Sequence, residues 1–434
     1  LDLAGTNTGT MSGNFDIRMD GTTFDVGTDD TLTLTGNMYN GAGAGGFIKT
    51  GDGTLVLTGS TISYSGTTTI SAGTLQVGAG GTTGSLTSGA NKNVVNNGTL
   101  VFNRSDNITV SNAISGSGDL IQDGSGTVTL NASNSYTGAT TINAGTISIG
   151  ATNRLGSTSG VYLGNGTELI YTAAVAGNLT RAITVTSGTA TVSNTGSGLL
   201  TLSGAISKNG TTLVLDGGSN GIDVTGVISG SAANSDLVVE GNVTLSAANT
   251  YNGPTTITAG SNLTANVTNA MGNTTSVVMH NGGSLLVRAN DSINDTASMT
   301  MNGSTLKFDG NITEWVGALT LSANSTIDMG GGNIALHFSD LVAGLTAVTR
   351  LNIYNYTLYS DHLYFTNNAN VSDSLPYISF YSGWGTGLIG NSFISSLSSP
   401  WQVQPVPEPE TWATAAILLI GSGIYLLRRK KQAA

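Results

Sequence analysis

The chain has 434 residues, of which 62 are glycine and only 9% are charged, so glycine is about twice as frequent as in an average protein and charge less than half as frequent. The absence of cysteine excludes disulfide scaffolds, thiolate metal sites and cysteine nucleophiles. The net charge of −11 opposes binding to phosphate, so we expect no nucleic-acid partner, and the three histidines form no cluster that predicts a metal or another cofactor.

The N-terminus gives the first expectation. Residue 1 is leucine, and residues 1–20 contain no basic segment followed by an apolar one. We therefore expect that a signal peptide has been removed or that the sequence is a fragment.

Short runs that alternate threonine with leucine, valine or isoleucine recur through most of the chain. Examples are residues 31–35, 54–58, 127–130 and 146–149, which are bounded by glycine, asparagine or aspartate. A period of two predicts β-strands with aliphatic side chains directed inward and Thr or Ser directed outward. Helical periodicity appears nowhere before residue 411, so the body is predicted to be all β.

Between residues 40 and 310 these strands belong to repeated units. Each of three aligned copies combines a glycine-bounded strand, an aromatic-x-Gly turn and the sequence Thr-Thr-Ile followed by Ala-Gly. The aromatic residues of the three turns are Tyr64, Tyr136 and Tyr251. A second shared module covers residues 154–169 and 270–285. Such repetition predicts a solenoid with coils of about 20–25 residues.

The repeated units resemble the autotransporter-associated β-strand repeat, which reads loosely Gly-x-Gly-Thr-Leu-x-Leu, Tyr-x-Gly and Thr-Thr-Ile-x-Ala-Gly-Thr-Leu. The resemblance implies a right-handed parallel β-helix on an exported protein. We assign this repeat body to residues 1–338. A series of separate β-sandwich domains is the structural alternative.

Two glycine-rich stretches fit short functional patterns by letter. Residues 41–46 satisfy G-x-G-x-x-G, and residues 217–221 fit G-x-S-x-G with Ser219 in the nucleophile position. Both patterns need a helix after the glycines, whereas strands are predicted from residues 47 and 222. We interpret both stretches as turns and predict no catalytic residue.

Acidic residues near the N-terminus offer an alternative function. They could line a polysaccharide-cleaving groove or bind a hard cation, and they are Asp16, Asp20, Asp25, Asp29 and Asp30. Aspartates more often cap turns in this kind of chain, and no local motif selects one pair. The repeated tyrosines could likewise form a carbohydrate-stacking face, but their fixed place before a turn glycine favours packing at a coil corner.

From about residue 339 the chain becomes richer in aromatic residues and poorer in glycine. We predict a β module over residues 339–404 that caps the open edge of the last coil, because an uncapped solenoid end is a template for aggregation.

The last segment, residues 405–434, contains a predicted transmembrane helix. Residues 411–427 are uncharged, and Trp412 and Tyr425 lie near the two ends, where aromatic rings favour the membrane interface. The helix is followed by the basic tail Arg428, Arg429, Lys430 and Lys431. By the positive-inside rule this tail lies in the cytoplasm, so residues 1–410 are predicted to be outside the inner membrane. A buried core helix is the alternative.

The residues just before this helix are Val406, Pro407, Glu408 and Pro409. A Pro-Glu-Pro motif, a short apolar helix and a basic tail in this order resemble the PEP-CTERM sorting signal. The resemblance implies recognition and processing by an exosortase, a membrane enzyme. The Pro-Glu-Pro segment is stiff and extended, which would allow a membrane enzyme to bind it as a strand.

Taken together, the sequence predicts a non-enzymatic β-helical protein of a Gram-negative bacterium. It would pass through an inner-membrane intermediate to the cell surface or extracellular matrix, with a role in adhesion, biofilm or display. Its expected partners are an exosortase, the membrane before processing, and an exopolysaccharide. A polysaccharide-active or polysaccharide-binding β-helix anchored in the envelope is one alternative. The other is an envelope protein that stays anchored because its C-terminal tail is never cut.

Overall fold

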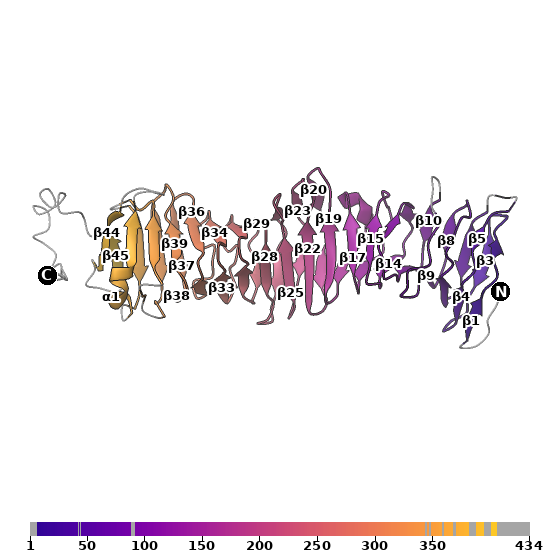
Figure 1. Cartoon of the computed structure of the whole chain (residues 1–434), viewed down its shortest axis with the longest axis horizontal. Coiled ribbons are helices and arrows are strands. Elements are labelled where there is room, and N and C mark those ends of the chain that lie inside the picture. The colour runs from indigo at the N-terminus through magenta and orange to yellow at the C-terminus, as the bar shows by residue number, and fades with distance from the viewer. Residues whose placement is uncertain are drawn as a thin grey trace, which may run out of the picture. The chain divides into compact units, whose positions relative to one another are not determined.

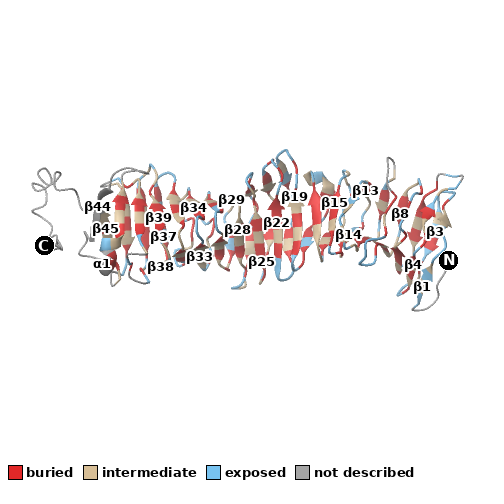
Figure 2. Ribbon diagram, viewed as in Figure 1, coloured by how far each residue is buried: buried red, intermediate tan, exposed pale blue. Residues whose placement is uncertain are grey.

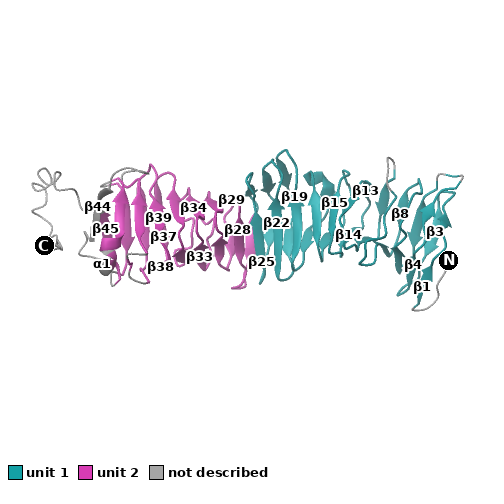
Figure 3. Ribbon diagram, in the orientation of Figure 1, with its two compact units in different colours: residues 1–226 teal, residues 227–434 magenta. Residues whose placement is uncertain are grey.

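The computed structural model describes residues 7–405 except for 42, 44, 88–91, 343–344, 347–348, 358–359, 368–369, 382–387 and 395–400. The chain divides into two compact units, residues 1–226 and residues 227–434 (Figure 3). Each unit is a stack of coils built from short parallel strands.

In the first unit, each strand pairs in parallel with strands one coil away in sequence (Figure 1). The first ladder contains β1 (Thr8–Met11), β4 (Thr31–Leu34), β7 (Thr54–Leu57), β9 (Thr74–Val77), β11 (Thr99–Phe102), β14 (Asp119–Gln122), β16 (Thr140–Ile142), β18 (Val161–Leu163), β21 (Ile183–Val185) and β24 (Ile206–Ser207). The second contains β3 (Thr22–Asp25), β6 (Phe47–Thr50), β8 (Thr68–Ile70), β10 (Val94–Asn96) and β13 (Ile114–Ser115). The third contains β12 (Ile108–Val110), β15 (Thr127–Leu130), β17 (Thr146–Ile149), β19 (Thr167–Tyr171), β22 (Thr189–Asn194) and β25 (Thr212–Asp216). Shorter ladders contain β2 (Phe15–Asp16) with β5 (Met38–Tyr39), and β20 (Gly177–Leu179), β23 (Leu200–Leu202) and β26 (Ile222–Val224), while η1 (Thr152–Leu155) is a 3-10 turn.

The second unit has the same construction. One pair is β27 (Ile228–Gly230) with β30 (Thr250–Tyr251). One ladder contains β28 (Leu237–Glu240), β31 (Thr255–Ile257), β33 (Ser276–Met279), β35 (Ser298–Met301) and β38 (Leu319–Leu321). Another contains β29 (Asn242–Leu245), β32 (Asn262–Ala265), β34 (Ser284–Val287), β36 (Thr305–Phe308), β39 (Ser325–Asp328), β41 (Leu351–Tyr354) and β43 (Ile378–Tyr381). The last contains β37 (Ile312–Val316), β40 (Ile334–Phe338) and β42 (His362–Phe365).

The strand register shows that successive coils differ in length. In the first unit Thr54 pairs with Thr74 and Thr74 pairs with Thr99, so the second of these coils is the longer one. In the second unit the pair Leu237 and Thr255 closes a short coil, whereas the pair Leu351 and Ile378 closes a long one. The predicted parallel solenoid is therefore confirmed, and its coil lengths extend to both sides of the range of about 20–25 residues that the repeats predict.

The core of each unit is formed by alternate residues of the strands. In β9, Leu75 and Val77 are buried while Thr74 and Gln76 remain partly exposed. Figure 2 shows the same alternation of buried and intermediate residues along most strands of both units. Burial of aliphatic side chains from every coil contributes about 25 cal/mol per Å² of apolar surface removed from water, so stacking itself stabilises the chain without disulfides.

Glycine allows the close approach of successive coils at several corners. Gly98, Gly118 and Gly138 occupy equivalent positions in three coils of the first unit. A Cβ atom on Gly118 would lie 2.1 Å from the carbonyl oxygen of Gly98, and one on Gly138 would lie 2.3 Å from the carbonyl oxygen of Gly118. These glycines are needed because of backbone contact between coils. The high glycine content of the chain thus has a direct structural cause.

The last described strands reverse direction. β41 and β42 still pair in parallel with the preceding coils. Antiparallel pairs then join β43 to β44 (Leu388–Ile394), β44 to β45 (Trp401–Pro405), and β45 to β42. The short helical turns α1 (Val371–Ser374) and η2 (Leu375–Tyr377) precede β43. A capping role for residues 339–404 stays a prediction.

No helix among the described residues is long and apolar enough to cross a membrane. The predicted transmembrane helix, residues 411–427, lies outside those residues, and it too stays a prediction.

Candidate functional site

The predicted sorting and anchoring residues all lie beyond the described part of the chain. They are the motif residues Val406, Pro407, Glu408 and Pro409 and the tail residues Arg428, Arg429, Lys430 and Lys431. Their proposed roles therefore rest on the sequence.

Two of the N-terminal aspartates, Asp16 and Asp20, cap turns of the neighbouring coil. Asp16 accepts a hydrogen bond from the Gly41 N–H (2.7 Å) and pairs with Arg18, which lowers the pKa of its carboxyl. Asp20 accepts from the Gly46 N–H (2.9 Å). These contacts fit the capping interpretation, since each carboxylate satisfies a backbone donor of the next coil. Within the described residues no group of three or more His, Asp or Glu side chains is placed to hold a metal.

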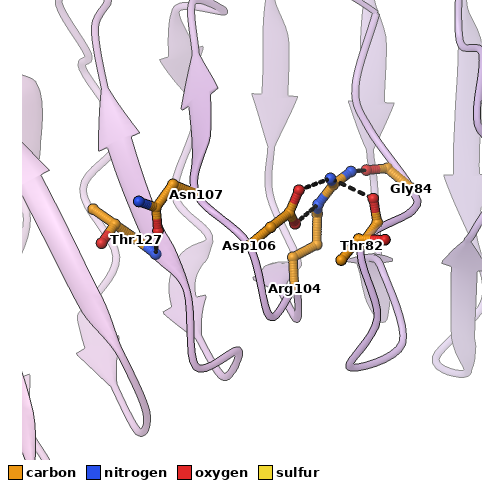
Figure 4. A network of polar contacts seen from close by, with 6 residues as sticks. All are labelled: Thr82, Gly84, Arg104, Asp106, Asn107 and Thr127. Carbon is orange, nitrogen blue, oxygen red and sulfur yellow. Dashed lines mark hydrogen bonds and ion pairs between the residues drawn. The ribbon is translucent and has the colours of Figure 1, made fainter.

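A second corner network surrounds Arg104 (Figure 4). Its guanidinium donates to both carboxylate oxygens of Asp106, at 2.8 and 2.6 Å, and to the carbonyl oxygens of Thr82 and Gly84. The bidentate contact lowers the pKa of the partly exposed Asp106 carboxyl. This arrangement ties the loop at residues 82–84 to the turn one coil later, so we assign it to corner stabilisation.

The three repeated tyrosines are buried, which confirms the packing interpretation and not the carbohydrate-stacking one. Tyr136 and Tyr251 are at most 1% exposed. The Tyr136 hydroxyl contacts the Thr140 hydroxyl (2.7 Å), which contacts the Thr158 hydroxyl (3.1 Å). Thr158 donates to the Gly138 carbonyl oxygen (2.7 Å). Burial raises the pKa of Tyr136, so the hydroxyl remains protonated.

The same cluster occurs in the second unit. There the Tyr251 hydroxyl contacts Thr255 (2.7 Å), Thr255 contacts Thr274 (2.9 Å), and Thr274 donates to the Gly253 carbonyl oxygen (3.0 Å). The second threonine of each cluster comes from the second shared module, residues 154–169 or 270–285. The two sequence modules therefore recur together because they build one buried cluster.

An outward-facing aromatic row distinguishes the second unit. Strand register places Trp315 of β37 beside His337 of β40, and His337 beside Tyr364 of β42. The indole and imidazole rings are stacked at 3.8 Å with an interplanar angle of 11°, and the imidazole and phenol rings at 4.3 Å with an angle of 15°. We call Trp315, His337 and Tyr364 the aromatic row. It is the candidate functional site of this chain.

The row ends in an accessible indole. His337 is 9% exposed, whereas Trp315 is 42% exposed although it stacks on His337. Beyond Tyr364 the register continues to Gln402 of β45, whose side chain contacts His362 Nδ1. Stacked rings are held in a fixed orientation, so the row holds the partly exposed Trp315 ring in place at one end and has polar groups at its far end.

The central histidine of the row is neutral at ordinary pH. Burial, with a smaller effect of His362, lowers the pKa of His337 to about 4. Its Nδ1 atom is buried and has no hydrogen-bond partner among the described residues. A neutral imidazole stacks on its two neighbours without bringing a charge to the surface.

Glu314, next to Trp315, explains why the row ends there. Its two carboxyl oxygens accept the N–H groups of Ser292 (3.0 Å) and Ile293 (2.8 Å), which belong to the preceding coil. The Glu314 side chain thus satisfies backbone donors that a neighbouring strand would otherwise pair, and β37 is the edge strand of its ladder. Burial raises the pKa of Glu314 to about 8, opposed by these two N–H groups and assisted by Asp291 and Asp295.

This raised pKa predicts a pH dependence of stability. The folded protein binds a proton at Glu314 that the unfolded chain releases near pH 4.5, so the free energy of unfolding should fall as pH rises towards 8. Between pH 6 and 8 the expected loss is about 2 kcal/mol. Urea denaturation at both pH values checks this, and Glu314→Gln should remove that part of the dependence.

The matched control for this measurement is Glu240→Gln, which neutralises a partly exposed glutamate of the same unit. It should keep the wild-type dependence. An equal pH dependence in wild type and Glu314→Gln would contradict the assignment.

Sequence reasoning did not find the aromatic row. Trp315, His337 and Tyr364 each lie on a different coil, and only the strand register brings them together. The one available signal was the rise in aromatic content towards the C-terminus.

The stacked parallel ladders define a parallel β-solenoid, and comparison with known proteins gives the kind of repeat. The family described as Passenger-associated-transport-repeat matches residues 47–77, 120–149 and 240–261. Each match contains one of the three buried tyrosines. The chain is therefore a parallel β-solenoid in which three segments match this repeat family, as the repeats predict.

One named relative extends this comparison. The adhesin BmaC autotransporter of Brucella suis biovar 1 (strain 1330) is 36% identical over 107 residues, which are 25% of this chain and 3% of that protein. The chain thus spans only a small fraction of the relative's length. No solved structure matches the chain significantly.

Proposed function

We propose that this protein is an exported, non-enzymatic surface or extracellular-matrix protein with an adhesin-like role. The observation that carries the proposal is the match of three passenger repeats to segments that form coils in the structure. The similarity to a protein named as an adhesin supports the same role.

A solenoid suits this role because it repeats its outward side chains. In the first unit, register aligns a row of threonines from five successive coils, which are Thr8, Thr31, Thr54, Thr74 and Thr99. Neighbouring members of such a row are separated by about 4.8 Å, the spacing of paired strands. Equivalent groups repeated in this way favour a repetitive partner, because many weak contacts act together.

The proposed route to the surface uses the C-terminal segment. Pro407, Glu408 and Pro409 would be recognised by an exosortase while residues 411–427 hold the chain in the inner membrane and the basic tail fixes its orientation. Support comes from the order of these three features in the sequence.

Intact mass of the protein recovered from its native host tests this route. Wild-type protein should lack the segment 411–434, and the variant Pro407→Ala with Pro409→Ala should retain it. The control is Pro405→Ala, outside the motif, which should be processed like wild type. If the wild-type protein also retained residues 411–434, the tail would be a plain anchor and the sorting proposal would fail.

Polysaccharide binding is the second candidate function. The observation that favours it is the exposed Trp315 indole at the end of the aromatic row, because flat aromatic rings accommodate the apolar faces of sugar rings.

A further inference from the structure

We infer that Trp315, at the end of the aromatic row, is the contact point for a hexopyranose ring of a neutral polysaccharide. This inference rests on the proposed surface function and gives it a site and a ligand class. The carrying observation is that a large aromatic side chain stays 42% exposed while one neighbour fixes its orientation.

The geometry of the row suits a stacked sugar. The three rings of Trp315, His337 and Tyr364 are nearly parallel, with interplanar angles of 11° and 15°. The Trp315 side chain therefore needs little ordering when a ligand arrives, which lowers the entropic cost of binding. The C–H groups of a pyranose face carry partial positive charge and complement the negative face of an indole.

The charges around the row favour a neutral ligand. Asp291 and Asp295 lie close enough to raise the pKa of Glu314, and the chain carries a net charge of −11. A polyuronate would meet this negative potential, whereas a neutral sugar would not. The pKa of His337, lowered to about 4, leaves the stacked imidazole uncharged, so the row offers no cation to an acidic ligand.

Trp315 is more exposed than the other outward-facing stacked pair of this unit, Tyr354 and Tyr381, which are only partly exposed. Tyr162 of the first unit is 37% exposed, but its register neighbours are Thr141 and Thr184. The stacked pair Phe338 and Phe365, by contrast, is buried in the core. Trp315 is thus exposed, as Tyr162 is, and also has a stacked aromatic neighbour, as Phe338 has.

Calorimetric titration of the purified full chain tests the inference. The probes are the neutral oligosaccharides cellohexaose and mannohexaose and the acidic hexagalacturonate. Wild type should bind at least one neutral probe more tightly than the acidic one. Trp315→Thr should weaken that binding at least about tenfold, as expected for a central aromatic anchor. Threonine is the residue found at many outward strand positions, so this variant preserves strand formation.

The matched control is Tyr162→Thr, which removes an exposed aromatic ring without a stacked neighbour. It should bind within twofold of wild type. Absence of binding to both neutral probes, tighter binding of the acidic probe, or binding by Trp315→Thr within twofold of wild type would overturn the inference. Because purified protein is used, such a result would leave the proposed surface location to be decided by the intact-mass experiment.

Discussion

Replacing Gly118 by alanine is expected to lower the free energy of unfolding by about 3 kcal/mol, the upper part of the range for overpacking. The added Cβ would lie 2.1 Å from the Gly98 carbonyl oxygen and 2.8 Å from the Gly98 nitrogen. Both atoms belong to the backbone, so no side-chain rotation relieves the contact. The same carbonyl oxygen accepts the N–H of Asp119 (2.9 Å), and that hydrogen bond would be strained as the coils separate.

Urea denaturation of wild type and variant measures this loss, with Gly81→Ala as the control. No atom lies within 4 Å of a Cβ on Gly81, so this second substitution should leave stability unchanged or raise it by up to about 1 kcal/mol. Equal stabilities for the two variants would show that glycine serves the turns by flexibility alone and not by close approach.

Replacing Tyr136 by alanine is expected to cost about 4 kcal/mol, because the ring is fully buried and a cavity would remain. Tyr136→Phe should cost about 1–2 kcal/mol, since it keeps the ring but removes the hydroxyl that contacts Thr140. Thermal and urea unfolding of both variants separate the packing contribution from that of the hydrogen bond.

The control for this pair is Tyr162→Phe, a change at a tyrosine that is 37% exposed. Its effect should stay within about 0.5 kcal/mol. If Tyr136→Phe were equally neutral, the buried chain of hydroxyls through Thr140 and Thr158 would have no part in stability.

The sequence contains enough information to predict the coils and their cores. Alternating runs such as residues 74–77 place Leu75 and Val77 inside, as period two requires. The repeated tyrosines were also predicted correctly, because their position before a turn glycine is a local feature. In such cases neighbouring residues alone decide the outcome.

Other features were not predictable from hydrophobic alternation alone. Lys49 lies in the interior of β6, where its ammonium donates to the carbonyl oxygens of Thr50 and Gly51 at 2.7 Å each. Gln122 makes equivalent contacts to the carbonyls of Gly124 and Gly126, at 2.7 and 2.8 Å. Simple hydrophobic alternation assigns polar residues to the outside, whereas here the turn carbonyls provide partners that make burial favourable.

The aromatic row was missed for a different reason, because it depends on strand register. The coils differ in length, so the sequence separation from Trp315 to His337 differs from that between His337 and Tyr364. These separations follow from turn geometry, which short sequence patterns do not encode. Without knowledge of the strand register, the sequence does not show that Trp315 has stacked aromatic neighbours.

The backbone contact between Gly98 and Gly118 has a consequence for how such a chain changes in length over evolution. The two glycines lie one coil apart, and Thr99 pairs with Asp119 in the following coil. A duplication or deletion of this interval would carry one glycine and one set of inward side chains with it, and would leave both flanking coils in register. Genetic gain or loss of sequence is thus tolerated in whole coils, whereas a smaller insertion or deletion within a strand would misalign the contacts of that strand with its neighbours.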